Sequence, residues 1–150
     1  MSFAPAAGIG LYIERKTDID CLSLNDTPMS PRILVADDDR ALQILLNVIL
    51  SRAGFEVDFA SNGRTALAKA MADSYDAIML DLVLPDMSGN EILQQLEKGR
   101  PESLKKIIVL TGAGRGVVDQ IDGQRVRAVL RKPFDIQDVI RITAECANER

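Results

Sequence analysis

Short apolar runs alternate with helical patterns along most of this chain, and this alternation limits the possible folds more than any other feature. Three of the runs are unbroken, which is typical of strands that are buried on both faces. Strands are expected in five segments: 33–36, 55–59, 77–80, 107–110 and 126–130. Each is followed by a segment with apolar residues at helical spacing, and the weakest of these, 112–125, contains four glycines. The pattern therefore predicts five strand–helix units.

Strand–helix units of this kind form a parallel sheet with helices on both faces. Crossovers between parallel strands are right-handed, so few topologies remain. For five units we expect an α/β fold, a flavodoxin-like doubly wound five-stranded parallel sheet with strand order 2-1-3-4-5.

Residues 1–31 lack a sustained period and are expected to be an N-terminal extension, whereas 32–150 form the folded domain. Two explanations for the extension stay open. It is a flexible tail, or it is a start-site artefact, because Met29 directly precedes the first strand.

Composition excludes several classes of function. The net charge is −4 and the sequence pI is about 4.9, which argues against direct binding of nucleic acid and against docking on anionic membranes. No apolar run is long enough to span a bilayer, and no signal peptide is evident. Cys21 and Cys146 form no metal-binding pattern, which favours a reducing cytoplasm. Histidine is absent, so any phosphohistidine must come from a partner.

Polar side chains stand where the expected strands end. Asp37 and Asp38 follow the first strand, Asp81 the third, Thr111 the fourth and Lys132 the fifth. In the order 2-1-3-4-5 these strands are neighbours, and functional groups of such folds gather at the carboxyl ends of the strands. The five residues are therefore expected to share one edge of the sheet.

Clustered carboxylates repel one another, and a divalent cation removes that repulsion. Mg2+ suits a site with a few carboxylate oxygens and retained waters. Lys132 adds a positive charge and Thr111 a hydroxyl, so the edge would combine a carboxylate nucleophile, a metal and two groups that bind phosphoryl oxygens. That combination is sufficient for phosphoryl transfer.

Between Arg32 and about Ala147 the sequence resembles the response-regulator receiver family, in its single-domain, chemotaxis-regulator-like form. Four stretches carry the resemblance: 33–39 (ILVADDD), 79–89 (MLDLVLPDMSG), 110–112 (LTG) and 130–134 (LRKPF). The resemblance implies that Asp81 is the phosphoacceptor, with Thr111 and Lys132 binding the phosphoryl group. It further implies that Mg2+ is held by Asp38 directly, by Asp37 directly or through water, by Asp81 and by the backbone carbonyl of Val83. The Lys132–Pro133 bond is expected to be cis.

By the same resemblance, a sensor histidine kinase or a histidine phosphotransfer protein supplies the phosphoryl group. Output is expected to pass to a protein partner through the face of the fourth helix, fifth strand and fifth helix, because the sequence leaves no room for an output domain after that helix. The domain is not expected to be an enzyme beyond Mg2+-dependent self-phosphorylation and slow autodephosphorylation.

Two departures from the family pattern refine these expectations. Val129 stands where many receivers have an aromatic residue. The conformational change on phosphorylation is therefore expected to be small and centred on 112–116 and the following helix. Val83 and Ala113 flank the expected path of a hydrolytic water and carry no polar side chain, so the aspartyl phosphate is expected to be long-lived.

Three alternative functions were weighed. A pseudo-receiver would use the fold without phosphorylation. A haloacid-dehalogenase-type phosphatase would use Asp37 and Asp39, but Ala41 stands where its motif has Thr or Val. The glycine-rich stretch 111–116 resembles a dinucleotide-binding turn, but Val118 replaces a required glycine, so no cofactor is expected there.

Overall fold

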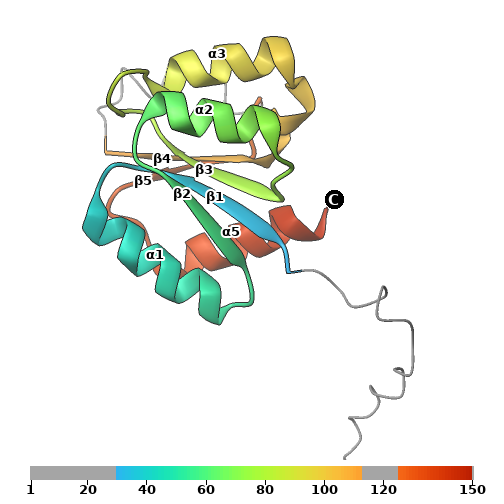
Figure 1. The fold of residues 1–150 in the computed structure, drawn as a ribbon. Coiled ribbons are helices and arrows are strands. Elements are labelled where there is room, and N and C mark those ends of the chain that lie inside the picture. Colours follow the sequence, from blue (N-terminus) through green and yellow to red (C-terminus); the bar gives the residue numbers. More distant parts are fainter. Residues whose placement is uncertain (1–29, 113–124, 150) are drawn as a thin grey trace, which may run out of the picture.

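A parallel five-stranded sheet lies at the centre of the part of the chain that the computed structural model describes, residues 30–112 and 125–149 (Figure 1). Its elements in chain order are β1 (Arg32–Ala36), α1 (Arg40–Arg52), β2 (Glu56–Ala60), α2 (Gly63–Ala72), β3 (Ala77–Asp81), α3 (Gly89–Gly99), the 3-10 helix η3 (Pro101–Lys106), β4 (Ile107–Thr111), β5 (Ala128–Arg131) and α5 (Ile136–Asn148). The strand order β2-β1-β3-β4-β5 confirms the predicted topology.

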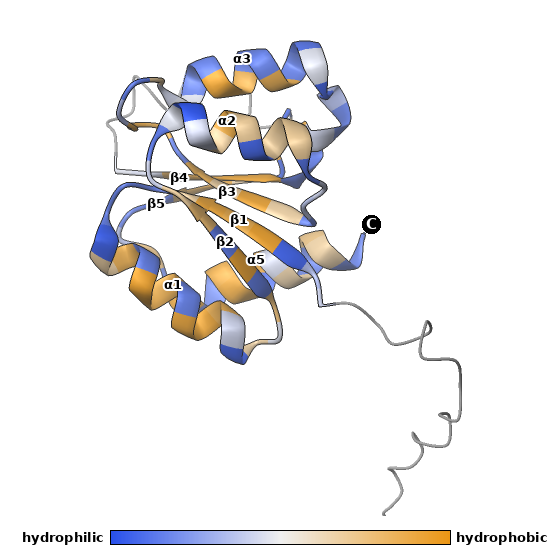
Figure 2. Cartoon of the chain, viewed as in Figure 1, coloured by the Kyte–Doolittle hydropathy of each residue, from blue (hydrophilic) through white to orange (hydrophobic). Residues whose placement is uncertain are grey.

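Helices cover both faces of the sheet, α2 and α3 on one and α1 and α5 on the other (Figure 1). Each central strand sends alternate side chains to the two sides. In β1, Leu34 and Ala36 join the core under α2 and α3, while Ile33 and Val35 join the core under α1 and α5. β3 and β4 are buried along their whole length, which explains their unbroken apolar runs. Figure 2 shows this apolar centre.

Side-chain caps fix where the helices begin. Asp39 accepts hydrogen bonds from two backbone amides of the first turn of α1 and so caps this helix. Ser88 and Glu91 form a reciprocal capping box at the start of α3. After α1, Gly54 has a φ of 97°, which a glycine adopts without strain, and the chain turns there into β2.

The guanidinium of Arg100 caps the carboxyl end of α2. Its Nη1 donates to the backbone oxygens of Ala70 at 3.0 Å, Met71 at 3.3 Å and Asp73 at 2.8 Å. The positive charge thus meets carbonyl groups that the helix itself leaves without partners, and it ties the end of α3 to α2.

Two details differ from the sequence predictions. β5 begins at Ala128 rather than at 126, although Arg127 N already donates to Ile107 O. η3 was not predicted, and Pro101 at its start suits the first turn of a helix. Residues 1–29 of the expected extension 1–31 and most of the expected fourth helix, 113–124, lie outside the described residues. No helix of the described part is both long enough and apolar enough to cross a membrane.

Candidate functional site

The polar residues singled out in the sequence lie at the carboxyl edge of the sheet. Asp37 and Asp38 follow the last residue of β1, Asp81 ends β3, Thr111 ends β4, and Lys132 follows β5. The order β1-β3-β4-β5 makes these strands successive neighbours, so residues far apart in the sequence are brought to one edge. Lys132 N donates to Thr111 O at 2.8 Å, which continues the pairing of the last two strands.

Three carboxylates form the centre of the site. Asp37, Asp38 and Asp81 each offer an oxygen, and these oxygens all lie within 4.8 Å of one another. Asp37 is fully buried and Asp81 is 6% exposed, whereas Asp38 is exposed to solvent. Buried charges at this spacing need a cation beside them.

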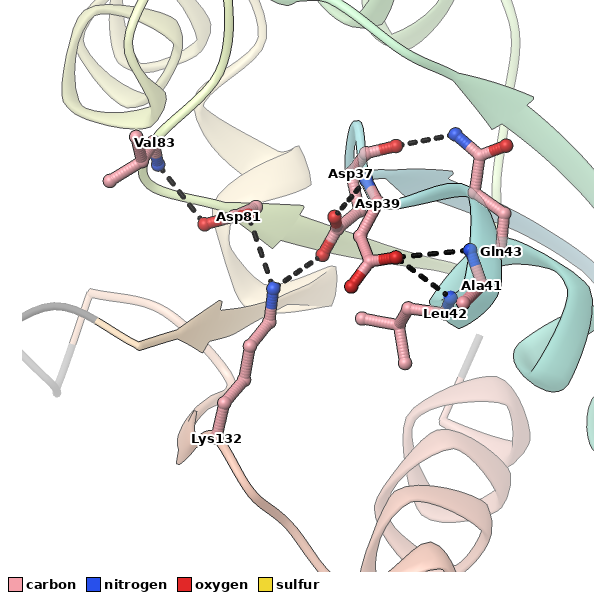
Figure 3. Close-up of polar contacts among 8 residues, drawn as sticks. All are labelled: Asp37, Asp39, Ala41, Leu42, Gln43, Asp81, Val83 and Lys132. Atoms are coloured by element: carbon pink, nitrogen blue, oxygen red, sulfur yellow. Dashed lines mark hydrogen bonds and ion pairs between the residues drawn. The ribbon is translucent and has the colours of Figure 1, made fainter.

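Lys132 supplies a cation from the fifth strand (Figure 3). Its ammonium donates to Asp37 Oδ2 at 2.7 Å and to Asp81 Oδ2 at 3.2 Å. The peptide bond between Lys132 and Pro133 is cis, as expected. Although burial alone lowers the pKa of Lys132, the hydrogen bond and charge of Asp37 and the charge of Asp81 raise it above its usual value.

Asp81 is held in an environment that opposes its charge. Burial raises its pKa above the usual value and the charge of Asp37 adds to this, while Val83 N, donating at 3.0 Å, and Lys132 act in the opposite direction. The site therefore keeps an ionised carboxylate at a cost in free energy, which an additional cation would relieve.

The backbone around Asp37 is tied by groups that the sequence analysis did not single out. Asp39 N donates to Asp37 Oδ1 at 2.8 Å. Gln43 Nε2 donates to Asp37 O at 2.5 Å (Figure 3). It also donates to Ser61 Oγ at 3.0 Å, and thereby joins the loops after β1 and β2. The signal for Gln43 was present, since this polar residue shares the buried stripe of α1 with Leu46 and Leu50.

The two valines of the sequence analysis differ in environment. The side chain of Val83 is 66% exposed beside Asp81, whereas Val129 is partly buried and packs against the core under α2 and α3. Ala113, the second residue expected to flank the path of water, lies outside the described residues.

The donor set suits a small hard cation. It consists of three carboxylates, and one of them, Asp38, is exposed and open to a hydrated ion. Mg2+ prefers oxygen ligands and keeps part of its water shell, so the three carboxylates fit it.

The sequence is similar to those of known proteins. The family model for the response regulator receiver domain matches residues 33–144. The DNA-binding dual master transcriptional regulator RpaA of Synechocystis is 36% identical over 112 residues, 73% of this chain and 46% of the relative. The transcriptional regulatory protein SrrA of Staphylococcus aureus is 36% identical over 114 residues, 75% of this chain and 46% of the relative. The chain thus matches about half the length of these curated relatives.

Solved structures agree with the fold. A CheY-like receiver domain protein from Methanospirillum hungatei has a TM-score of 0.73 and 30% identity, covering 81% of this chain and 96% of the other. The response regulator TrrA from Thermotoga maritima, solved in complex with Mg2+ and BeF, has a TM-score of 0.69 and 29% identity, covering 77% and 98%. With its fold, its carboxylate edge and the family match in agreement, the chain belongs to the response regulator receiver domain family of two-component systems.

Proposed function

We propose that Asp81 accepts a phosphoryl group from a phosphohistidine of a sensor histidine kinase or a histidine phosphotransfer protein. The observation that carries this proposal is the meeting of Asp37, Asp38 and Asp81 with the ammonium of Lys132 at one edge of the sheet. Among these carboxylates Asp81 ends the central strand β3 and is only slightly exposed.

In the proposed reaction an oxygen of Asp81 attacks the phosphorus of the phosphohistidine. A P–O bond to the aspartate forms as the P–N bond to the imidazole breaks, and the imidazole leaves with the bonding electron pair and takes a proton from solvent. Lys132 and the hydroxyl of Thr111 then bind oxygens of the transferred group. Hydrolysis of the aspartyl phosphate is slow, so the domain works as a switch rather than as an enzyme.

Mg2+ would be held by Asp38, Asp81 and the backbone carbonyl of Val83. Asp37 takes part directly or through water, and its carboxylate already accepts from Lys132 and from Asp39 N. When bound, Mg2+ neutralises the carboxylates and the phosphoryl oxygens during transfer.

The phosphodonor protein docks on α1 in this proposal. Ile44, Leu45 and Val48 are 57%, 41% and 43% exposed, and they lie on a helix that begins just after the site. Figure 2 shows that α1 is apolar over much of its length. Exposed apolar side chains that lie together often mark interaction surfaces, and a donor that reaches Asp81 must lie over this same edge.

Output would pass through a protein partner on the face expected for the fourth helix, β5 and α5; most of the expected fourth helix, 113–124, lies outside the described residues. The matched part of RpaA and SrrA is less than half of each regulator, so their DNA-related activities are not transferred to this chain. We propose a cytoplasmic location because the phosphodonor acts there.

Labelling experiments test the function. The protein is incubated with acetyl phosphate and Mg2+, beside Asp81→Asn and the control Asp73→Asn, which replaces an aspartate at the end of α2. We expect a hydroxylamine-sensitive phosphoryl adduct on the wild type and the control and none on Asp81→Asn. Full labelling of Asp81→Asn would refute the acceptor assignment. No adduct on any variant would indicate a pseudo-receiver, and rapid repeated release of phosphate would indicate a phosphatase.

A further inference from the structure

The loop between β3 and α3 contains a residue in an uncommon backbone conformation. Among non-glycine residues of the described ranges, Asp86 alone has a positive φ, 63°. Such a conformation costs free energy and persists where surrounding contacts fix it. The side chain of Asp86 also makes a contact with a distant segment.

That contact is with the first turn of α2. Asp86 Oδ1 accepts from Arg64 N at 3.0 Å, across 22 residues of sequence. Pro85 O accepts from Gly63 N at 3.0 Å. A helix leaves its first amides without intrahelical partners, and here the loop after Asp81 satisfies two of them. The negative charge of Asp86 also suits the amino end of a helix.

Gly63 allows the loop to approach the helix backbone directly. A Cβ at this position would lie 2.1 Å from Met87 O and 2.6 Å from Met87 Cβ. No side chain fits in that space, so the tip of the loop rests against α2 itself.

The other end of the loop rests on the phosphoacceptor strand. Val83 N donates to Asp81 Oδ1 at 3.0 Å, and Gly89 N donates to Leu82 O at 2.9 Å. The loop is therefore held at Asp81 through Val83 N, and at α2 through Pro85 and Asp86.

We infer that Asp86 is a positioning residue: by fixing the loop to α2 it holds the backbone of Val83 in place beside Asp81. This inference rests on the proposed function, in which the Val83 carbonyl is a metal ligand. Loss of the Asp86 contact lets the loop depart from α2, so Val83 N leaves Asp81 more often and the carbonyl is presented to Mg2+ for less of the time.

The test compares three variants of the full chain. Asp86→Gly keeps the positive φ accessible but removes the acceptor. Asp86→Asn keeps an acceptor oxygen and tolerates the same backbone conformation. Asn62→Ala is the matched control, because Asn62 Oδ1 accepts from Thr65 N at 2.8 Å and so caps the same turn of α2 from within the helix segment.

Two readouts are measured: hydrogen–deuterium exchange of the Val83 amide without Mg2+, and the Mg2+ concentration that gives half-maximal labelling by acetyl phosphate. In Asp86→Gly we expect exchange to accelerate about tenfold and the Mg2+ midpoint to rise about threefold to tenfold. Asp86→Asn should restore both to near wild type. Asn62→Ala should lower the thermal midpoint as Asp86→Gly does, with neither readout changed.

The inference is overturned if Val83 exchanges at the wild-type rate in Asp86→Gly. It is also overturned if Asn62→Ala accelerates that exchange equally, since helix stability rather than the loop contact would then control Val83. Failure of the wild type to accept any label would refute the proposed function instead, and the exchange comparison would still decide the role of Asp86.

Discussion

Lys132 and Asp37 lie 95 residues apart in the sequence, yet the lysine ammonium donates to the aspartate Oδ2 at 2.7 Å. The contact joins the first and the last strand segments of the domain across β3 and β4. It also places a monovalent cation among the carboxylates that would bind Mg2+. The ammonium and the metal therefore compete for the same negative charge.

Removing the ammonium should strengthen metal binding. For Lys132→Met we expect Mg2+ affinity to rise by about tenfold, because a positive charge near a divalent cation is unfavourable even at an effective dielectric constant of about 20. Isothermal titration with MgCl2 measures this. Lys69→Met is the control, since Lys69 pairs with Asp58 away from the site and its loss should leave the affinity unchanged. Weaker Mg2+ binding in Lys132→Met would contradict the competition.

Replacing the acceptor carboxylate should stabilise the metal-free protein. Burial, with the charge of Asp37, raises the pKa of Asp81 in the folded state above its ordinary value of 3.8. A raised pKa favours folding below pH 3.8, and this contribution is lost as the pH rises through the folded-state pKa. At pH 7 the wild type has lost it, whereas Asp81→Asn does not titrate.

We therefore expect Asp81→Asn to have a higher free energy of unfolding at pH 7 than the wild type, and a higher thermal midpoint. The difference should shrink as the pH falls through the raised folded-state pKa toward 3.8, and also when Mg2+ is added, because the cation stabilises only the wild-type carboxylate. Thermal melts across pH, with EDTA or MgCl2, measure it. An Asp81→Asn protein less stable than wild type at pH 7 would show that the ionised carboxylate does not destabilise the fold.

The exposed side chain of Val83 should prolong the life of the aspartyl phosphate. An apolar side chain beside the acceptor orients no water, and orientation is a large part of phosphoryl-transfer catalysis. Val83→Asn should release phosphate about tenfold faster than wild type, with Val83→Ile as an apolar control that stays slow. Ala113→Glu extends the test to the second expected flanking position. Loss of wild-type label within seconds, or equal rates in all variants, would refute this role.

Arg100 should contribute more to stability than ordinary surface arginines do. Arg100→Ala removes three charge-assisted hydrogen bonds to the end of α2, for which we expect a loss of about 1–2 kcal/mol. Urea denaturation measures the loss. Arg141→Ala is the control, since in the described part of the chain Arg141 makes solvent-exposed pairs with Asp138 and Glu145, and its loss should lower the stability much less. Equal losses would argue against a capping role.

Polar substitutions on α1 should distinguish docking of the phosphodonor protein from the transfer reaction at Asp81. Ile44→Ser with Val48→Ser should slow labelling by a phosphohistidine protein about tenfold or more, because apolar contact area with the donor is lost. Labelling by acetyl phosphate, which needs no docking, should stay at the wild-type rate. Met71→Ser is the control, as an exposed apolar residue of α2. Equal slowing with both donors would indicate damage to the site instead.

Much of the fold was predictable because burial on both faces leaves a direct mark on the sequence. The apolar runs of β1, β3 and β4 predict strands, and the strand order follows from general rules of crossover connections. The candidate site was predictable for a related reason. Asp37, Asp81 and Lys132 lie at or directly after the carboxyl ends of strands, and the carboxyl ends of neighbouring parallel strands lie at one edge of the sheet.

The supporting contacts were less predictable because they join distant segments through single hydrogen bonds. Nothing local to Asp86 indicates that it caps α2, 22 residues earlier in the chain. Nothing local to Arg100 indicates that it reaches the carbonyls at the other end of that helix. Such contacts depend on how the helices and strands pack against one another, and composition and periodicity do not predict that geometry.

The position of Lys132 in the sequence has a consequence for the newly made chain. Lys132 follows Asp81 by 51 residues, which take about 3–10 s to translate at about 5–20 residues per second. During that interval the three aspartates already exist without the ammonium that will balance them, and β5 is not yet available to pair with β4. The ammonium therefore reaches the carboxylates in a late step of biosynthesis, when the last strand is added to the edge of the sheet.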